Sequence, residues 1–261
     1  MLIDAHCHLD FPDFDADREA VLARAHAAGV KHIVVPGTTR ARWPGVLALG
    51  RRDDVSVCLG LHPYFIDEHG DDDLDALADA LAARSVGPPI VAVGECGVDG
   101  RLAETLDAQW RLFEAQVRLA KAHHLPLVIH CVRVNDEVAK RLRELAPPAG
   151  GLIHAFAGSP QQARRFIDLG FVVGLGGALT HERAQRLHRS VASLPDDGYV
   201  LETDSPDMPP AGHRGERNEP ARVLEVCHQV ARLRGQSVAR VAADSTATVR
   251  RLFGLERLPR G

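Results

Sequence analysis

The chain has 261 residues, of which 45% are hydrophobic and 25% are charged, and its formal net charge is −4. A negative net charge argues against a protein that coats nucleic acid through a broad basic surface, but it leaves open an enzyme that binds phosphate through metal ions. The five cysteines form no C-x-x-C pair, which argues against a disulfide framework or a structural zinc site. Cys7, Cys96 and Cys131 each adjoin a candidate metal ligand, and we expect them to be buried packing residues.

The N-terminal residues lack the basic segment and apolar stretch of a signal peptide. No apolar run approaches the roughly 20 residues that a membrane span needs. We therefore expect a cytoplasmic protein with no membrane partner.

Strand and helix patterns alternate along the chain. Short apolar runs, typical of buried parallel strands, occupy residues 1–8, 32–36, 55–61, 90–95, 125–130, 151–154, 171–175 and 199–204. Apolar residues at helical spacing occupy residues 14–28, 43–50, 74–84, 102–124, 135–145, 160–169 and 181–194, and two or three further helices are expected within residues 220–255. The loop 205–219 is rich in Pro and Gly, and loops of that length inside a domain are often functional.

Eight strands separated by helices predict an α/β fold of the (β/α)8 TIM-barrel type, as a single domain over residues 1–261. The alternative is an open doubly wound sheet, but the Gly-x-Gly-x-x-Gly fingerprint of dinucleotide-binding sheets is missing after the first strand. Gly174-Leu175-Gly176-Gly177 follows a late strand without that spacing, and we interpret it as a backbone turn.

Histidines and carboxylates stand at the ends of the apolar runs. His6 and His8 lie two residues apart, so both face the same side of an extended strand. The strand ends of a barrel converge on one face, where active sites lie. The candidates at these ends are His6, His8, His62, Glu95, His130, His154 and Asp204. A single one is weak evidence in a chain with 14 histidines, whereas their joint placement predicts a metal site.

The donor set is larger than one tetrahedral ion requires. Four histidines and two carboxylates suit two divalent ions about 3.5–4 Å apart that share a bridging carboxylate. Glu95 is the expected bridge because the fourth strand lies between the two groups of ligands. One ion would bind His6, His8 and Asp204, and the other would bind His130 and His154. This mixture of imidazoles and carboxylates is compatible with Mg²⁺, Mn²⁺ or Zn²⁺.

Other residues near these strand ends are candidates for substrate contact. His62 either donates a hydrogen bond to a substrate phosphate or simply caps its strand. Asp99 either fixes a loop or touches the substrate, and Arg133 is a cation that could clamp phosphate. Glu202 lies two residues before Asp204 on the same face, and we expect it to orient a metal ligand rather than to bind an ion.

The strand-end motifs resemble the TatD family of metal-dependent deoxyribonucleases, within the amidohydrolase-like barrels. They are Asp4-Ala5-His6-Cys7-His8-Leu9-Asp10, Gly60-Leu61-His62-Pro63, Gly94-Glu95-Cys96-Gly97-Val98-Asp99, Leu127-Val128-Ile129-His130, His154-Ala155-Phe156-Ala157-Gly158, Leu201-Glu202-Thr203-Asp204-Ser205-Pro206 and Asn218-Glu219-Pro220. The resemblance implies a (β/α)8-type barrel, divalent-metal-dependent phosphodiester hydrolysis and the ligand roles given above. It also implies that Asp204 is both a ligand and the proton acceptor for the nucleophilic water, and that Glu95 takes the place of the carboxylated lysine of other binuclear barrels.

Three positions depart from the usual pattern of this family. Gly100-Arg101 follows Asp99 where aromatic residues are usual, Val132 stands where an Arg is usual, and Ala157 stands where a Ser is usual. All three lie on the substrate side, so the metal chemistry is better supported than DNA as the substrate.

We therefore expect a divalent-metal-dependent hydrolase, and first of all a 3′–5′ deoxyribonuclease. A compact pocket without a basic groove suits DNA 3′ ends rather than long duplex DNA. The alternative is hydrolysis of another ester or amide at the same site, such as a D-aminoacyl-tRNA or a cyclic amide. A metal-binding protein without catalysis is a third interpretation, and the complete ligand set argues against it.

Overall fold

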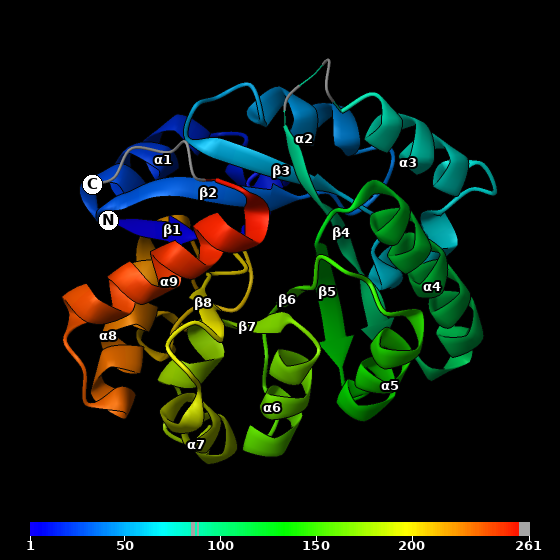
Figure 1. The fold of residues 1–261 in the computed structure, drawn as a ribbon. Coiled ribbons are helices and arrows are strands. Elements are labelled where there is room, and N and C mark those ends of the chain that lie inside the picture. Colours follow the sequence, from blue (N-terminus) through cyan, green and yellow to red (C-terminus); the bar gives the residue numbers. More distant parts are fainter. Residues whose placement is uncertain (85–86, 88, 256–261) are drawn as a thin grey trace.

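The computed structural model describes residues 1–84, 87 and 89–255, and its strands form a ring with helices on the outside (Figure 1). Each strand sits at or within a few residues of an apolar run of the sequence. In the described part of the chain the strands are β1 (Leu2–Asp4), β2 (Val30–Pro36), β3 (Val55–Leu59), β4 (Ile90–Asp99), β5 (Leu127–Val132), β6 (Gly151–Ile153), β7 (Phe171–Leu175) and β8 (Tyr199–Leu201).

Helices follow the strands and pack against the outside of the sheet. They are α1 (Arg18–Ala27), α2 (Trp43–Leu49), α3 (Asp73–Ala82), α4 (Leu106–His123), α5 (Asn135–Leu145), α6 (Pro160–Asp168), α7 (Gln185–Ser193), α8 (Val223–Arg234) and α9 (Val238–Phe253). Within the described ranges, none of these helices combines the length and the apolar character of a membrane span. The cytoplasmic location expected from the sequence stays a prediction.

The strand order confirms the predicted barrel. The sheet runs β1 to β8 in sequence order, and each neighbouring pair is parallel. A doubly wound sheet reverses its strand order at a switch point. The order found here does not reverse, so that alternative is wrong.

Several element boundaries differ from the prediction. β1 ends at Asp4, so His6 and His8 lie in the extended segment that follows the strand rather than within it. β4 is longer than expected and reaches Asp99. The segment after His62, for which no helix was predicted, forms a 3-10 helix, η2 (Pro63–Glu68), because Pro63 fixes a helical φ at its first position and the His62 side chain accepts a hydrogen bond from the Tyr64 N–H.

The barrel closes through the segments that follow β1 and β8. The Ala5 N–H donates to the Leu201 carbonyl (3.0 Å), and the Asp204 N–H donates to the His6 carbonyl (2.9 Å). The buried Asp4 carboxylate reinforces this seam, because it accepts from the Thr203 N–H (2.9 Å) and from the Thr203 hydroxyl (2.6 Å). The closure therefore places His6 directly beside Asp204.

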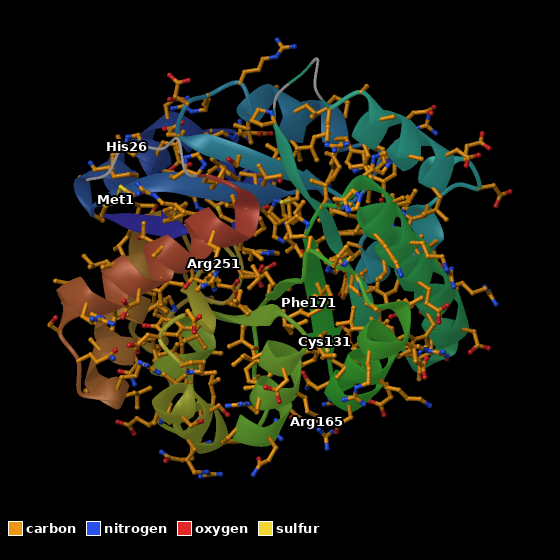
Figure 2. The ribbon with its side chains drawn as sticks, viewed as in Figure 1. Met1, His26, Cys131, Arg165, Phe171 and Arg251 are labelled. Carbon is orange, nitrogen blue, oxygen red and sulfur yellow. The ribbon has the colours of Figure 1, made fainter. Side chains whose placement is uncertain are left out.

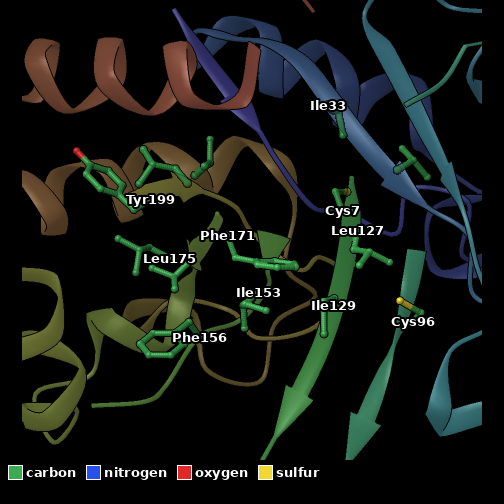
Figure 3. Packing of buried hydrophobic residues seen from close by; sticks show 14 of the residues in the cluster. Cys7, Ile33, Cys96, Leu127, Ile129, Ile153, Phe156, Phe171, Leu175 and Tyr199 are labelled. Atoms are coloured by element: carbon green, nitrogen blue, oxygen red, sulfur yellow. The ribbon is translucent and has the colours of Figure 1, made fainter. Parts of the chain in front are cut away.

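The larger hydrophobic core lies between the sheet and the helices. Figure 3 shows Leu127, Ile129 and Ile153 packed in this layer, with Cys7 and Cys96 among them. Both of these cysteines are fully buried, as predicted, but Cys131 is only partly buried because it stands near the exposed end of β5. The described cysteines are all free thiols, which agrees with the predicted lack of disulfides.

A second hydrophobic cluster fills the inside of the barrel. It includes Val128 of β5, Leu152 of β6 and Val200 of β8. Phe253 of α9 also belongs to it and lies near the first residues of β3 and β4. Strand side chains alternate between faces, so the inward positions continue two residues further along each strand. They lead to His130, His154, Glu202 and Asp204 at the opposite, carboxyl-terminal end of the barrel.

Charged side chains at the outer surface are paired locally. Arg165 and Arg251 point outward from the helices (Figure 2), and they form ion pairs with Asp136 and Asp197 respectively. Such exposed pairs contribute little to stability, with a typical value of about 0–1 kcal/mol.

The seam between β1 and β8 should depend on the Asp4 carboxylate. We expect Asp4→Ala to lower the free energy of unfolding by about 2–4 kcal/mol, because it leaves the Thr203 N–H and hydroxyl without their buried acceptor. Asp4→Asn keeps one acceptor oxygen and should lose less. Urea unfolding followed by circular dichroism measures both, with the exposed Asp53→Ala as control. Equal stability of Asp4→Ala and wild type would show that the seam does not need this carboxylate.

Candidate metal centre

Glu95 lies at the centre of the candidate site and is fully buried. Its two carboxylate oxygens face different histidines. Oε1 lies 2.8 Å from His154 Nε2 and 3.2 Å from His130 Nδ1. Oε2 lies 3.1 Å from His6 Nε2 and 3.3 Å from His8 Nε2. The carboxylate thus stands between two groups of imidazoles, as a bridging ligand would.

Asp204 completes the group on the Oε2 side. Its Oδ1 lies 3.5 Å from the Nε2 atoms of both His6 and His8. The Asp204 backbone has a left-handed φ of +56°, a conformation that Asp tolerates better than most residues. Donor atoms of His6, His8 and Asp204 lie within 4.8 Å of one another, which is close enough for one ion to contact all three.

Two observations test whether these residues fit metal ions. The Oε2 atom of Glu95 is buried and close to His6 and His8, but it makes no hydrogen bond of suitable geometry in the described part of the chain, which is costly for a carboxylate unless a cation binds it. Pairs of imidazole nitrogens also approach closely, at 3.3 Å for His6 Nε2 and His8 Nε2 and at 3.3 Å for His130 Nδ1 and His154 Nε2. Lone pairs aimed at one point repel each other in the absence of a cation, so the donor set fits divalent ions.

His130 and His62 differ in the hydrogen bonds that their rings make on the side away from Glu95. His130 Nε2 lies 3.1 Å from the Asp99 carboxylate, which accepts a hydrogen bond from the Nε2–H of a neutral ring and leaves the Nδ1 lone pair facing Glu95. His62 Nδ1 instead accepts a hydrogen bond from the Tyr64 N–H (3.0 Å), so a neutral His62 carries its proton on Nε2. That N–H lies 2.9 Å from Glu95 Oε1. His130 can therefore bind a metal, whereas His62 is a hydrogen-bond donor at the edge of the same centre.

Glu202 lies behind His154 rather than at the centre. Its Oε1 accepts a hydrogen bond from the Ala155 N–H (2.5 Å) and lies 3.9 Å from His154 Nδ1. Gly174 makes room for it, because a Cβ at this glycine would lie 2.3 Å from Glu202 Oε2. The glycine-rich stretch at 174–177 thus accommodates a buried carboxylate, a role beyond the backbone turn that we expected.

The charges in the site influence one another strongly. Burial acts to raise the pKa of Glu95, but the surrounding imidazoles outweigh it and hold that pKa well below its usual range. Burial likewise opposes ionisation of Asp204, while the hydrogen bond to His8 and the nearby histidines lower its pKa to about 2. Burial lowers the pKa of His6 to about 4, which keeps this ring neutral and able to act as a ligand.

A cavity of about 720 Å³ opens beside Glu95. His8, His62, His130, His154 and Asp204 line its floor, and Tyr64, Phe65, Val132, Ala157 and Met208 are among its walls. Arg133, a predicted substrate contact, is exposed at the end of β5 and does not line the cavity. Arg101 lines it instead, although sequence reasoning noted this residue only as a departure from the family pattern.

Two buried glutamines of α4 support the site and carried no functional signal in the sequence. Gln116 accepts a hydrogen bond from the Leu61 N–H (2.8 Å) and donates one to the Leu61 carbonyl (3.0 Å). Gln109 accepts from the Asp99 N–H (2.8 Å). The helix therefore fixes the backbone immediately before His62 and at Asp99.

A family model described as TatD related DNase matches residues 3–254. The chain belongs to this TatD-related family. It is 40% identical over 253 residues to the metal-dependent hydrolase YjjV of Escherichia coli (strain K12), covering 95% of this chain and 96% of that protein. The crystal structure of YjjV, a TatD homologue, has a TM-score of 0.93 and 38% identity to this chain and covers 97% of it and 98% of that structure.

A further relative carries a more specific name. The 3′-5′ ssDNA/RNA exonuclease TatD of Pantoea ananatis is 31% identical over 264 residues, covering 97% of this chain and all of that protein (100%). Together these relatives show that this TatD-family chain is a metal-dependent hydrolase, an enzyme that acts on ester bonds.

The stability of this TatD-family enzyme should depend on Gln116. We expect Gln116→Leu to lower the free energy of unfolding by about 2–4 kcal/mol, because the N–H and carbonyl of Leu61 lose their buried partners. Chemical denaturation measures this loss. The control is Gln161→Leu, the same change at an exposed position of α6. An equal effect of both substitutions would contradict the supporting role of Gln116.

Proposed function

We propose that the chain is a 3′–5′ deoxyribonuclease that hydrolyses phosphodiester bonds with two divalent ions, Mg²⁺, Mn²⁺ or Zn²⁺. The observation that carries this proposal is the position of Glu95, whose two oxygens each face a separate group of imidazole nitrogens. In the proposed centre His6, His8 and Asp204 would hold one ion, His130 and His154 would hold the other, and Glu95 would be shared by both.

The ions would supply the positive charge that lowers the pKa of a bound water and neutralises the attacking and leaving oxygens. The side chains of the chain do the positioning. Asp204 accepts the proton of the nucleophilic water, and His62 offers its Nε2 proton to a phosphate oxygen of the substrate. Asp99 orients His130 through its hydrogen bond to Nε2, and Glu202 places a carboxyl group behind His154, with Oε1 3.9 Å from Nδ1.

Two observations favour DNA 3′ ends over long duplex DNA. The cavity beside the centre has a volume of about 720 Å³, which suits a terminal nucleotide unit. Among the described residues that line it, Arg101 is the sole Lys or Arg, so no extended basic groove leads into the site. The name of the Pantoea ananatis relative points in the same direction.

A second candidate is hydrolysis of another ester or amide at the same centre, such as a D-aminoacyl-tRNA or a cyclic amide. Val132 and Ala157 favour it, because both line the cavity with apolar groups where Arg and Ser are usual in the family. These walls could accept a substrate that is less charged than DNA.

Removal of Glu95 should abolish the shared binding of the two ions. We expect metal-stripped wild type to bind two Mn²⁺ per chain and to degrade a 3′-labelled single-stranded DNA stepwise when Mg²⁺, Mn²⁺ or Zn²⁺ is added. Glu95→Ala should bind one ion or none and lose more than about 100-fold in activity, since even the residues that orient metal ligands are worth 10–100-fold.

Equilibrium dialysis with metal analysis gives the number of bound ions, and gel electrophoresis follows the DNA. Glu137→Ala, at an exposed position of α5, is the matched control. Full activity of Glu95→Ala would contradict the bridging role. Metal binding without DNA cleavage in wild type would favour the ester and amide alternative.

Asp204→Asn removes the proposed proton acceptor, and because Asp204 is also a proposed ligand, the bound metal is measured in each variant beside kcat. The amide keeps the shape of the side chain but is a poor proton acceptor, so we expect kcat to fall by about 10²–10⁴-fold. The comparison is Asp207→Asn, which removes a carboxylate from the wall of the same cavity. Equal losses in the two variants would show that the negative charge matters rather than a specific proton acceptor.

A further inference from the structure

Two exposed side chains line the same cavity. Tyr64 is 60% exposed, although it is a large aromatic residue, and the Arg101 side chain is 51% exposed. Both line the cavity beside Glu95. The hydrogen bonds to Asp99 raise the pKa of Arg101 most, and the Tyr64 phenol adds a smaller electrostatic contribution.

The guanidinium of Arg101 is fixed along one edge. Its Nε lies 3.0 and 3.1 Å from the two carboxylate oxygens of Asp99, and its Nη2 donates to the same carboxylate. Its Nη1 makes no hydrogen bond or ion pair with any residue that the structure describes. A planar fork anchored in this way presents its remaining N–H groups in a defined direction, which suits a phosphate oxygen.

The anchor of Arg101 connects directly to the metal centre. Asp99 is fully buried, and its carboxylate also accepts from His130 Nε2 at 3.1 Å. His130 in turn places Nδ1 3.2 Å from Glu95. The position of the cation is therefore fixed relative to the place where the ester bond would break.

Tyr64 is held by His62, another histidine that contacts Glu95. Its N–H donates to His62 Nδ1, and its ring contacts Phe65 edge to face, with centroids 5.8 Å apart. The exposed face of a phenol ring is a platform on which any nucleobase stacks. Thr38 adds a polar group to this cavity, since its buried hydroxyl has no hydrogen-bond partner within the described ranges.

We propose that Arg101 and Tyr64 form a subsite for the nucleotide next to the scissile phosphate, with its phosphate on Arg101 and its base on Tyr64. This inference rests on the proposed phosphodiester hydrolysis and makes it more specific. The substrate class is a single-stranded end that carries a second phosphate one nucleotide away from the bond that is cut.

The test compares two dinucleotides, dTpdT with and without a 5′-phosphate. We expect wild type to prefer the 5′-phosphorylated form by roughly 10- to 100-fold in kcat/KM, the usual range for a charge-assisted contact. Arg101→Gln should lose this preference, and Arg101→Lys, which keeps the charge without the fork, should retain part of it. Tyr64→Ala should raise KM for both dinucleotides, whereas Tyr64→Phe should not.

A binding measurement in EDTA separates this inference from the proposed function. Thymidine 5′-phosphate should bind metal-stripped Arg101→Gln about tenfold more weakly than metal-stripped wild type by calorimetry. Arg143→Gln, in the exposed last turn of α5, is the matched control, and circular dichroism checks that each variant is folded.

The outcomes are distinct. If wild type cleaves the dinucleotides but Arg101→Gln keeps both the preference and the affinity, the subsite is wrong while the proposed function stands. If Arg133→Gln rather than Arg101→Gln lost the preference for the 5′-phosphate, the phosphate contact would belong to Arg133 at the end of β5. That result would overturn the assignment to Arg101. No cleavage of either dinucleotide or of bis(p-nitrophenyl) phosphate with any of the three ions would overturn the proposed function and this inference together.

Discussion

The site depends on one buried carboxylate that faces two groups of histidines. An ionised carboxylate inside a protein is stable only when opposite charge or hydrogen-bond donors surround it. Glu95 meets this condition through His6, His8, His62, His130 and His154, and β4 is shaped to bring it there. Gly97 shows how closely β4 packs against β5, because its φ is +142° and a Cβ there would lie 2.0 Å from the His130 carbonyl oxygen. The close approach of β4 to β5 therefore requires glycine at this position.

The outer contacts of the histidines decide what each ring can do. Imidazole offers one lone pair and one proton when neutral, so whatever binds one nitrogen determines the chemistry of the other. Asp99 accepts a hydrogen bond from His130 Nε2 on the side of the ring away from Glu95. The Tyr64 N–H donates a hydrogen bond to His62 Nδ1 on the corresponding side of that ring. Both rings have a nitrogen within 3.2 Å of the same Glu95 oxygen. His130 is thereby a candidate metal ligand, and His62 is a candidate hydrogen-bond donor. Distance alone groups His62 with the metal-binding residues, and the hydrogen-bond pattern separates it from them.

The sequence predicted the barrel and the residues around Glu95 because both follow from simple periodicities. The inward positions of β5, β6 and β8 recur every two residues, from Val128 to His130, from Leu152 to His154 and from Val200 to Asp204. The prediction for Arg133 did not follow this alternation. The inward face of β5 continues from His130 to Val132, which lines the cavity, so the next residue, Arg133, lies outside it. The support from Gln109 and Gln116 was not predictable either, because contacts between a helix and a distant strand end leave no periodic signal.

The distribution of charge bears on how an acidic chain would act on the proposed anionic substrate. The centre combines the carboxylates of Glu95 and Asp204 with imidazoles that could hold metal ions, and bound ions would supply positive charge toward an anionic substrate. Two arginines near the loop 205–219 are engaged with acids, in the pairs of Arg217 with Asp17 and Arg24 with Glu219. In the proposed function, positive charge for substrate binding would come from the ions and from Arg101, the sole Lys or Arg among the described lining residues. Affinity gained at one point, rather than along a groove, would select chain ends and short substrates, because extra phosphates further along a long polymer would find no partner.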